Sequence, residues 1–504
     1  MSEQSSHRQI LISSAIIGGA SVINILIGLL RMKIVAILLG PAGIGLIGIL
    51  QNMITTASIM SAIGFGNVGT RQIAEANGRG DQAAIDASRR ALFWGTLILA
   101  VIGGVVFWAL RDILASKLLS DAALASTVGW LALGVALTVA TGSQRALLNG
   151  MRRIGDIARV TVLSSIFSTL LGVPLIFWLG NDGLLWFILV APLGSFIMSH
   201  LFVAGLPSIQ SGPTPIKVLS VQWRTMARLG FAFMVAGLAG TVGQLVVRTL
   251  VQSDLGSEQL GYFQAAWVIS MTYIGFVLGA MGTDYYPRLT AVIHDSDQTN
   301  RLVNEQSEVA VLLAGPVLLA MLALAPWVIK VLYSAEFAPA VKVLRWQILG
   351  DVLKIVSWPL GFVILAAGAG RTHIFAELSA MLTFAVATWW LLPLLGIEAT
   401  GLSFFIMYVV YLPLVYWLAR RRTSFCWSKT VLRDLLLLFT LALLVALTGM
   451  WHDVLGVTIG LVAASGFGIM ALIRLATMAS LGGPIGRLAT CVRRFLLETG
   501  IIHE

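Results

Sequence analysis

The fold is decided by the stretch NILIGLLRMKIVAILLGPAGIG, residues 24–45, in which two basic side chains interrupt a long apolar run. The run is too long for a helix of a soluble protein, and it ends at Gly40-Pro41. A charged side chain at membrane depth costs about 2.5 to 3.5 kcal/mol on insertion scales, so Arg31 and Lys33 are candidate functional residues. The stretch therefore predicts a membrane-spanning helix that carries functional charge.

The whole chain has the composition of a membrane protein. Of its 504 residues, 58% are hydrophobic and 11% are charged, whereas charged residues make up about a quarter of a soluble domain. A spanning helix needs about 20 apolar residues, and such windows follow one another along the chain. We predict an all-α polytopic membrane protein with about fourteen transmembrane helices, near residues 9–39, 43–66, 89–110, 122–146, 158–180, 183–206, 229–252, 259–286, 306–330, 341–367, 373–395, 399–419, 434–450 and 455–473.

The distribution of basic residues predicts the orientation. With the N-terminus in the cytoplasm, 24 of the 33 Lys and Arg residues fall in inner segments. By the positive-inside rule both termini are then cytoplasmic. This distribution accounts for the net charge of +10 without a nucleic-acid partner. The outer loops contain four basic residues, Arg111, Lys117, Lys330 and Lys342. The predicted spans contain the other five, Arg31, Lys33, Arg248, Arg345 and Lys354.

The predicted loops are too short for a soluble catalytic domain. The longest inner loop, residues 67–90, reads as an amphipathic helix on the membrane surface with a break at Arg79-Gly80-Asp81. The sequence has no nucleotide-binding glycine loop, nucleophile elbow or metalloprotease signature, and its six His residues have no metal-ligand spacing. We therefore expect no enzyme activity, no metal and no cofactor, which leaves ion coupling or downhill movement to drive transport.

Two short matches indicate an internal duplication. Residues 39–45, LGPAGIG, match residues 255–261, LGSEQLG, at an offset of 216. The glycine and arginine of residues 150–153 match those of residues 368–371 at an offset of 218. The repeated unit is then six helices, and an even number returns the chain to its starting side. Two six-helix bundles related by a pseudo-two-fold axis along the membrane normal are predicted.

Changes in composition mark the predicted domains. The N-terminal bundle covers residues 1–206, and residues 207–228, PSIQSGPTPIKVLSVQWRTMAR, have the Pro, Ser and Gly content of a linker. The C-terminal bundle covers residues 229–422 and ends in three arginines. Residues 423–504 add two transmembrane helices and a cytoplasmic tail.

One face of the first predicted helix is polar or small. Its members follow helical spacing: Ser14, Ser21, Asn24, Gly28 and Arg31. This stripe predicts that Arg31 faces the bundle interior. Lys33 lies about 200° further round a regular helix, beside Leu26, Leu30 and Ile37. A regular helix thus excludes Lys33 from the stripe, and the alternative role is that it snorkels to the outer interface.

The seventh predicted helix repeats the pattern with Gly237, Thr241, Gln244 and Arg248. At the offset of 216, position 248 corresponds to position 32, beside both cations of the first helix. Two equivalent helices with cations at one depth predict a cationic cavity, with Gln244 as a polar member. Diphosphate is the expected ligand, because Arg donates to phosphate oxygens in a bidentate manner. The structural alternative is an arginine that pairs with a backbone carbonyl or caps its helix.

The tenth predicted helix carries a third polar face: Gln347, Gly350, Asp351, Lys354, Ser357 and Gly361. Asp351 and Lys354 stand three residues apart and can form an ion pair, which lowers the cost of burying either. Either the pair is structural, or Asp351 titrates and releases Lys354 as the cavity changes side. Asp284 and Glu377, nearer to helix ends, are further coupling candidates.

The motifs around these residues resemble those of a known family. They are GPAGIGL, residues 40–46, and the tenth-helix block WQILGDVLK, residues 346–354, which continues to Ala376-Glu377. The chain resembles the polysaccharide transporters of the MOP flippase superfamily, most closely the Wzx-type translocases of O-antigen and enterobacterial common antigen. The likeness covers residues 9–422.

The resemblance implies a flippase of the bacterial cytoplasmic (inner) membrane. Such proteins move an undecaprenyl-diphosphate-linked oligosaccharide from the inner to the outer leaflet by alternating access, with coupling to a proton or sodium gradient. It implies that Lys33 and Arg248 line the cationic cavity, and that membrane lipids, a polysaccharide polymerase and a chain-length regulator are partners. The candidate substrate-binding residues are Arg31, Lys33, Arg248 and Lys354, with Asn24, Gln244 and Gln347 as polar cavity residues.

Two departures leave the carried glycan open. Asn24 stands where some family members have a basic residue. The last helix pair, residues 434–473, is absent from the twelve-helix pattern and looks like the last two helices of lipid II flippases. The alternatives are therefore a lipid II-type flippase or a drug or cation antiporter of the same superfamily, which would favour an acidic cavity. A membrane-embedded polymerase or glycosyltransferase would need a sizeable outer loop.

Overall fold

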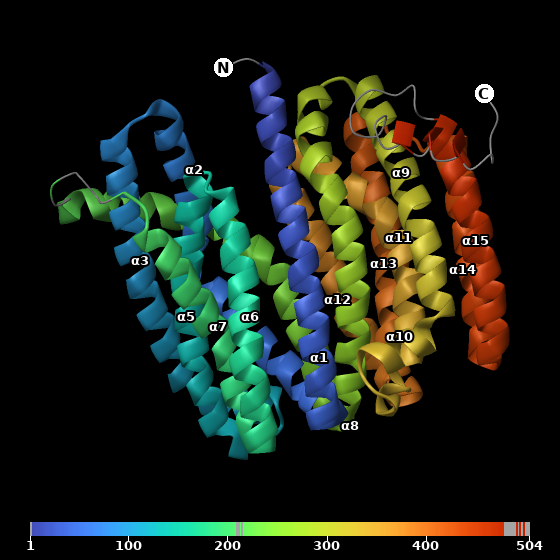
Figure 1. Cartoon of the computed structure of the whole chain (residues 1–504), viewed down its shortest axis with the longest axis horizontal. Helices are drawn as coiled ribbons and strands as arrows, with labels where there is room; N and C mark the ends of the chain where they lie inside the picture. Colours follow the sequence, from blue (N-terminus) through green and yellow to red (C-terminus); the bar gives the residue numbers. More distant parts are fainter. Residues whose placement is uncertain are drawn as a thin grey trace. The chain divides into compact units, whose positions relative to one another are not determined.

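The structure is a computed structural model that describes residues 3–207, 212, 215–477, 490–491, 493–494 and 497–498. Only the backbone is described for residues 3–17 and for Phe276, Ala280, Thr283, Asp284 and Thr477. Throughout this part of the chain the regular secondary structure is helical (Figure 1). The α-helices are α1 (Glu3–Ala62), α2 (Phe65–Arg79), α3 (Gln82–Ala109), α4 (Arg111–Leu118), α5 (Ala125–Gly150), α6 (Ile154–Leu179), α7 (Gly183–Ala204), α8 (Ile216–Val292), α9 (Ser296–Ala323), α10 (Ala325–Leu332), α11 (Ala340–Ala366), α12 (Gly370–Leu395), α13 (Glu398–Thr423), α14 (Lys429–Trp451) and α15 (Asp453–Thr477). Short 3-10 helices cover Ala122–Leu124, Gly180–Asp182 and Ala335–Phe337.

Among the described residues, eleven helical stretches are long and apolar enough to cross a membrane. Three of them contain two spans each: α1 is broken at Gly40, α8 is broken at Gly256, and one stretch runs through α6 and α7. Counted in this way, the eleven stretches account for the fourteen predicted spans. The chain is an all-α multi-pass membrane protein, which confirms the predicted fold class.

The two broken helices bend at equivalent glycines. Gly40 has φ 61° and ψ −168°, and Gly256, 216 residues later, has φ 84° and ψ 177°. This backbone conformation is essentially restricted to glycine. Each glycine therefore ends one membrane span and begins the next, at the position where the sequence motif is duplicated.

The duplication extends over the helices that follow. Helices α6 and α12 are both 26 residues long and start 216 residues apart. Between α5 and α6, Arg152 has φ 57°, and Gly368, 216 residues later, has φ 70° in the turn before α12. The predicted match of residues 150–153 with 368–371 is therefore wrong by two residues. The equivalent turns share a left-handed backbone position, which a glycine or an arginine fills, so residue identity gave the wrong register.

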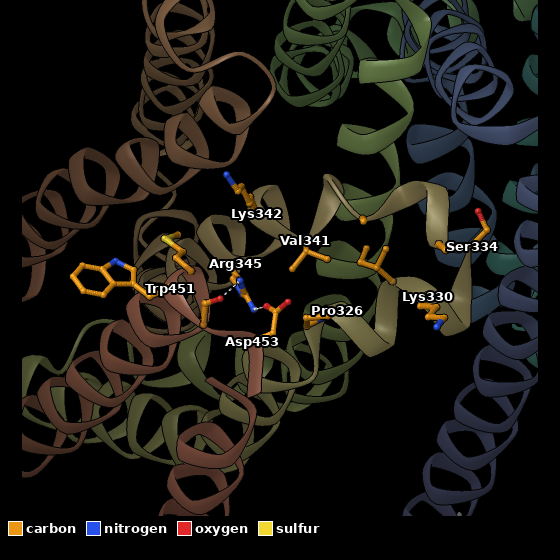
Figure 2. A pocket seen from close by; sticks show the side chains of 13 residues that line it. Pro326, Lys330, Ser334, Val341, Lys342, Arg345, Trp451 and Asp453 are labelled. Atoms are coloured by element: carbon orange, nitrogen blue, oxygen red, sulfur yellow. Dashed lines mark hydrogen bonds and ion pairs between the residues drawn. The ribbon is translucent and has the colours of Figure 1, made fainter. Parts of the chain in front are cut away.

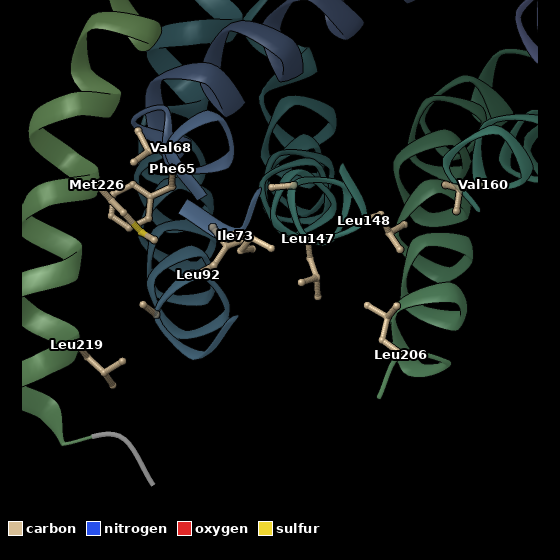
Figure 3. Close-up of a cluster of buried hydrophobic side chains, with 12 residues drawn as sticks. Phe65, Val68, Ile73, Leu92, Leu147, Leu148, Val160, Leu206, Leu219 and Met226 are labelled. Carbon is tan, nitrogen blue, oxygen red and sulfur yellow. The ribbon is translucent and has the colours of Figure 1, made fainter. Parts of the chain in front are cut away.

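Packing divides the chain into two compact units, Met1–Gly261 and Tyr262–Glu504. The division falls inside α8, because the first part of this helix packs within the first unit. A buried cluster there joins α2, α3, α5, α6 and the end of α7 to the start of α8 (Figure 3). Its members include Phe65, Leu92, Leu148, Val160, Leu206, Leu219 and Met226. The predicted boundaries at residues 206, 229 and 422 remain predictions.

Within the first unit the duplicated motif packs against itself. A Cβ atom on Gly45 would fall on the backbone oxygen of Ser257, and one on Gly261 would fall on the backbone of Pro41. The two contacts are equivalent, since 45 corresponds to 261 and 41 to 257 at the offset of 216. Glycine allows backbones to approach this closely where any side chain would separate them.

Helices α14 and α15 pack on α9 in the second unit, and α14 also touches α11. Asp434 of α14 is fully buried and forms ion pairs with Arg433 at 2.8 Å and with Arg474 of α15 at 3.1 Å. Arg474 also pairs with Glu308 of α9 at 3.1 Å. This cluster, Glu308–Arg433–Asp434–Arg474, joins α14 and α15 to α9 at the end of the spans that is predicted to be cytoplasmic.

Replacing Asp434 by Asn is expected to destabilise the second unit. Breaking a buried ion pair costs roughly 3 to 5 kcal/mol, and we expect about 2 to 3 kcal/mol here because both arginines reach solvent. The midpoint of thermal unfolding in detergent measures the effect. Glu75→Gln is the control, because it breaks an exposed pair with Arg71 and should cost less than about 1 kcal/mol. Equal midpoints for the two variants would contradict the proposed fastening.

Candidate functional site

Arg31 of α1 points toward α6 and α7 of the first unit. Its Nη1 donates a hydrogen bond to Ser168 Oγ over 2.7 Å, and its guanidinium lies 5.9 Å from the ring centre of Phe187. Its Nε is buried without a hydrogen-bond partner among the described residues. A buried unsatisfied donor is uncommon in proteins. The unused hydrogen-bond donor at Nε makes Arg31 a candidate to bind an anionic oxygen.

Lys33 and Asn24 are half-buried on the same helix. The apolar neighbours expected beside Lys33 are exposed: Leu26 by 61%, Leu30 by 60% and Ile37 by 62%. Lys33 therefore lies on a different face from Arg31, in keeping with the helical spacing. The roles of Lys33 and Asn24 in a cavity remain predictions.

Arg248 of α8 is buried, with 4% of its surface exposed. Its Nη1 donates to the side-chain oxygen of Gln244 over 3.1 Å and to the backbone oxygen of the same residue over 3.5 Å. Gln244, predicted as a polar cavity residue, is thus a direct partner of Arg248. Gln244, four residues earlier, therefore holds the guanidinium against the preceding turn of the same helix.

Sequence reasoning missed Arg145, which it counted among the residues of an inner loop. Helix α5 continues to Gly150, so Arg145 stays on the helix and lines two cavities of about 470 and 450 Å³ in the first unit. Thr55, Thr138 and Gly142 line both cavities as well. In the described structure the Nε of Arg145 is buried without a hydrogen-bond partner. The available signal was a polar stripe at helical spacing, Thr138, Thr141, Gly142 and Arg145.

Asp351 of α11 is fully buried in the second unit. Its Oδ2 accepts hydrogen bonds from Ser270 Oγ and Tyr273 Oη, both over 2.6 Å. Its Oδ1 has no partner within the described part of the chain. The predicted ion pair with Lys354 does not form there, because the two hydroxyl groups of α8 hold the carboxylate instead.

Lys354 and Glu377 share a cavity of about 340 Å³ in the second unit, which His373 and Tyr408 also line. The Lys354 Nζ lies 3.3 Å from Met271 Sδ and 5.9 Å from the ring centre of Tyr408. Glu377 Oε1 accepts a hydrogen bond from Tyr411 Oη over 2.6 Å. An ammonium group and a carboxylate from different helices thus face one polar, aromatic-lined space.

Two other predicted residues lie on α8 and α11. Gln347 is fully buried, and neither its Nε2 nor its Oε1 has a partner among the described atoms. It stands one turn before Asp351, so two buried polar groups with unused capacity follow each other along α11. Asp284 belongs to α8, but its side chain lies outside the described residues.

Arg345 belongs to a separate site at the other end of α11, shown in Figure 2. Its Nη1 donates to the backbone oxygen of Gly449 over 2.6 Å, and its Nη2 donates to Asp453 Oδ1 over 2.9 Å. Gly449 lies in the last turn of α14 and Asp453 is the first residue of α15, so the two partners flank the turn between these helices, and they line a pocket of about 420 Å³ with Arg345. Arg345 therefore fastens this turn to α11.

Comparison with solved structures shows which known fold the chain has. A multidrug resistance MATE family transporter of the MOP superfamily, in an inward-facing conformation, matches 80% of this chain and 94% of its own with a TM-score of 0.68 at 17% identity. The lipid II flippase MurJ, in an inward closed conformation, matches 92% of this chain and 99% of its own with a TM-score of 0.68 at 13% identity. The chain has the fold of MOP-superfamily transporters.

Sequence comparison identifies the family. Residues 34–342 match the model of the family described as polysaccharide biosynthesis protein, and the chain belongs to this family. The lipid III flippases of Escherichia coli (strain K12) and Shigella flexneri are each 26% identical over 424 residues, which cover 80% of this chain and 97% of theirs. These relatives are flippases rather than enzymes, which confirms the prediction that the chain is not an enzyme.

Proposed function

We propose that the chain is a Wzx-type flippase that moves an undecaprenyl-diphosphate-linked oligosaccharide from the inner to the outer leaflet of the bacterial inner membrane. Its product would serve the synthesis of O-antigen, common antigen or exopolysaccharide, and both termini would be cytoplasmic. The observation that carries the proposal is the 26% identity to the E. coli lipid III flippase along 97% of that protein. A match over nearly a whole relative supports a shared class of substrate more strongly than a local motif does.

Three arginines of the first unit, of which Arg248 is buried and Arg31 and Arg145 are half-buried, supply the chemistry for a diphosphate. Arg31 and Arg145 each keep a buried Nε without a partner in the described region, and Arg248 is held by an uncharged amide. Guanidinium groups donate two parallel hydrogen bonds to phosphate oxygens, and they hold their charge at any physiological pH. We assign the diphosphate to these arginines, with Lys33 as a further candidate in the same unit; Lys354 is a separate candidate in the second unit.

A flipping assay in sealed proteoliposomes tests the proposal. A fluorescent undecaprenyl-diphosphate oligosaccharide in the inner leaflet should become accessible to a membrane-impermeant reductant only when the protein is present. The recovered lipid should be unchanged in length. A lengthened glycan would instead indicate a polymerase. Uptake of a cationic dye without lipid movement would indicate a drug antiporter.

The lipid II flippase reading is the second candidate. The match to MurJ covers 92% of the chain, which is more than residues 1–422 can supply, so it extends into α14 and α15. The same proteoliposomes loaded with fluorescent lipid II separate the two candidates. Faster movement of lipid II than of the oligosaccharide-linked lipid would favour the second.

Asp351 is the proposed coupling group, ahead of Glu377 and Asp284. A buried carboxylate with one oxygen held by two hydroxyls and the other unused can take up a proton or a sodium ion at Oδ1. Asp351→Asn keeps the shape of the side chain and removes its charge. Transport by this variant is expected to lose its response to an imposed proton or sodium gradient, while the variant still binds the lipid.

The rate with and without each gradient, measured in the flipping assay, checks this prediction. Glu377→Gln is the comparison, because Glu377 also has a tyrosine partner at 2.6 Å. If Glu377→Gln alone abolishes the response, coupling belongs to the cavity of Lys354 and not to Asp351. An unchanged response in both variants would contradict both assignments.

A further inference from the structure

A groove in the first unit, away from the arginines assigned to the diphosphate, has no role in the proposed function. It lies between α3 and α5 beside α4 and has a volume of about 680 Å³. Small and apolar residues form most of its wall: Gly104, Val105, Gly129, Ala132 and Leu133. Figure 1 shows α3 and α5 running side by side in this unit.

Arg111 stands at one end of this groove, with two tryptophans. Its guanidinium lies over Trp108, 4.0 Å from the ring centre, and Trp130 is also part of the wall. The Arg111 side chain is 30% exposed, and its Nε is 3.9 Å from Asp112, too far for a hydrogen bond. A cation and two tryptophans at one end of an apolar groove match the level of lipid headgroups.

The second unit shows what covers the equivalent surface. At an offset of 214, α3 corresponds to α9, and both are 28 residues long. Leu312 and Leu319 of α9 are 1% and 0% exposed, on the helix that α14 and α15 cover. The equivalent residues of α3, Ile98 and Val105, are 43% and 60% exposed. The repeated surface is therefore covered by protein in one unit and open in the other.

Each unit also has an arginine beside this surface, although the two arginines come from different positions in the repeat. Arg345, at the offset of 216, corresponds to Gly129 in α5. In the first unit, Arg111 lies against that glycine, with its Cδ 3.0 Å from where a Cβ would be. In the second unit, the covering helices offer Arg345 a carboxylate oxygen from Asp453 and a carbonyl oxygen from Gly449. A molecule that covers the groove in the first unit should likewise bring an anionic oxygen to Arg111.

We infer that the groove between α3 and α5 binds a phosphate-headed lipid, whose phosphate contacts Arg111 and whose acyl chain lies along Gly104, Val105 and Leu133. The phosphate replaces the carboxylate that Asp453 supplies to Arg345, and the acyl chain replaces the apolar cover of α14 and α15. A partner helix would pair the charge only if it also carried a carboxylate opposite Arg111, as α15 does for Arg345 with Asp453, whereas a phosphate-headed lipid supplies the anion and the apolar chain in one molecule. The lipid pairs the charge of Arg111 and covers the apolar wall. This site is separate from the proposed diphosphate site.

Native mass spectrometry of the full-length protein in detergent tests the inference. The probes are phosphatidylglycerol and diacylglycerol with the same acyl chains, which differ by the phosphate headgroup. The protein is expected to retain phosphatidylglycerol in preference to diacylglycerol. Arg111→Ala should reduce this retention about tenfold, the loss expected for one charge-assisted hydrogen bond. Val105→Trp should reduce it by filling the groove.

Lys117→Ala is the matched control, because Lys117 is an exposed cation on the same short helix as Arg111. It should retain phosphatidylglycerol as the unaltered protein does. Unfolding midpoints show whether each variant is folded. Equal retention of the two lipids, or unchanged retention by folded Arg111→Ala, would overturn the inference. A dimer that Val105→Trp dissociates would assign the groove to a second copy of the chain and would also overturn it.

Discussion

Arg248→Ala is expected to slow flipping of the lipid-linked oligosaccharide about 100-fold, because removing one partner of a buried charged contact costs roughly 2 to 5 kcal/mol. Arg248 is the most deeply buried of the predicted substrate-binding cations, with 4% of its surface exposed. Without it, the diphosphate loses a bidentate donor at a depth where water cannot replace it. Arg31→Ala should have an effect of the same order, since Arg31 donates to Ser168, lies near the Phe187 ring and keeps a buried Nε without a partner among the described residues.

The initial rate in the proteoliposome assay is the measurement. Arg228→Ala is the matched control, because Arg228 is an exposed arginine on the same helix as Arg248. Arg248→Lys should recover part of the rate, because a lysine restores the charge without the bidentate geometry. Wild-type rates for folded Arg31→Ala and Arg248→Ala would remove the cationic site from the proposed function. Activity with lipid II in place of the oligosaccharide-linked lipid would leave the site intact and change only the cargo.

Gly261→Ala is expected to prevent correct folding or to lower the free energy of unfolding by several kcal/mol. The added Cβ would fall on the backbone of Pro41, and two backbones cannot give way as a flexible side chain does. Gly45→Ala should act in the same way at the equivalent contact. The yield of monodisperse protein and the midpoint of thermal unfolding measure the effect.

Gly240→Ala provides the control on the same helix. A Cβ at Gly240 would meet no atom within 4 Å, so this variant should fold normally and gain a little helix stability. If Gly261→Ala and Gly240→Ala unfold at the same temperature, the close crossing of α1 and α8 is not needed for stability.

Most of the fold followed from hydropathy. Apolar length decides membrane spans almost alone, because no backbone group can remain unpaired in lipid. The break at Arg79-Gly80-Asp81 was also predictable, since Gly80 adopts the left-handed conformation and Asp81 caps α3. The ninth span was predicted to end at residue 330, but α9 ends at Ala323. Pro326 lies in the first turn of the separate helix α10, because a proline fits the first turn of a helix and not its interior.

The candidate site was less predictable, because spacing along one helix fixes a face but not its partner. Helical spacing separated Arg31 from Lys33, and it could have found Arg145, which lies inside the predicted span 122–146 but was counted with the inner loop that follows. It also suggested an ion pair between Asp351 and Lys354. Ser270 and Tyr273, some 80 residues away in sequence, hold that carboxylate instead. Only tertiary packing brings such partners together.

The ion pairs that hold α14 and α15 in place limit where the protein can be truncated. A shortened version that stops at codon 422, to match twelve-helix relatives, would leave Arg345 facing lipid without Asp453 and Glu308 without Arg474. Unpaired charges at those positions would favour misinsertion and aggregation, so we expect the truncated protein to be inactive. Expression vectors for this protein therefore need the coding sequence through Thr477.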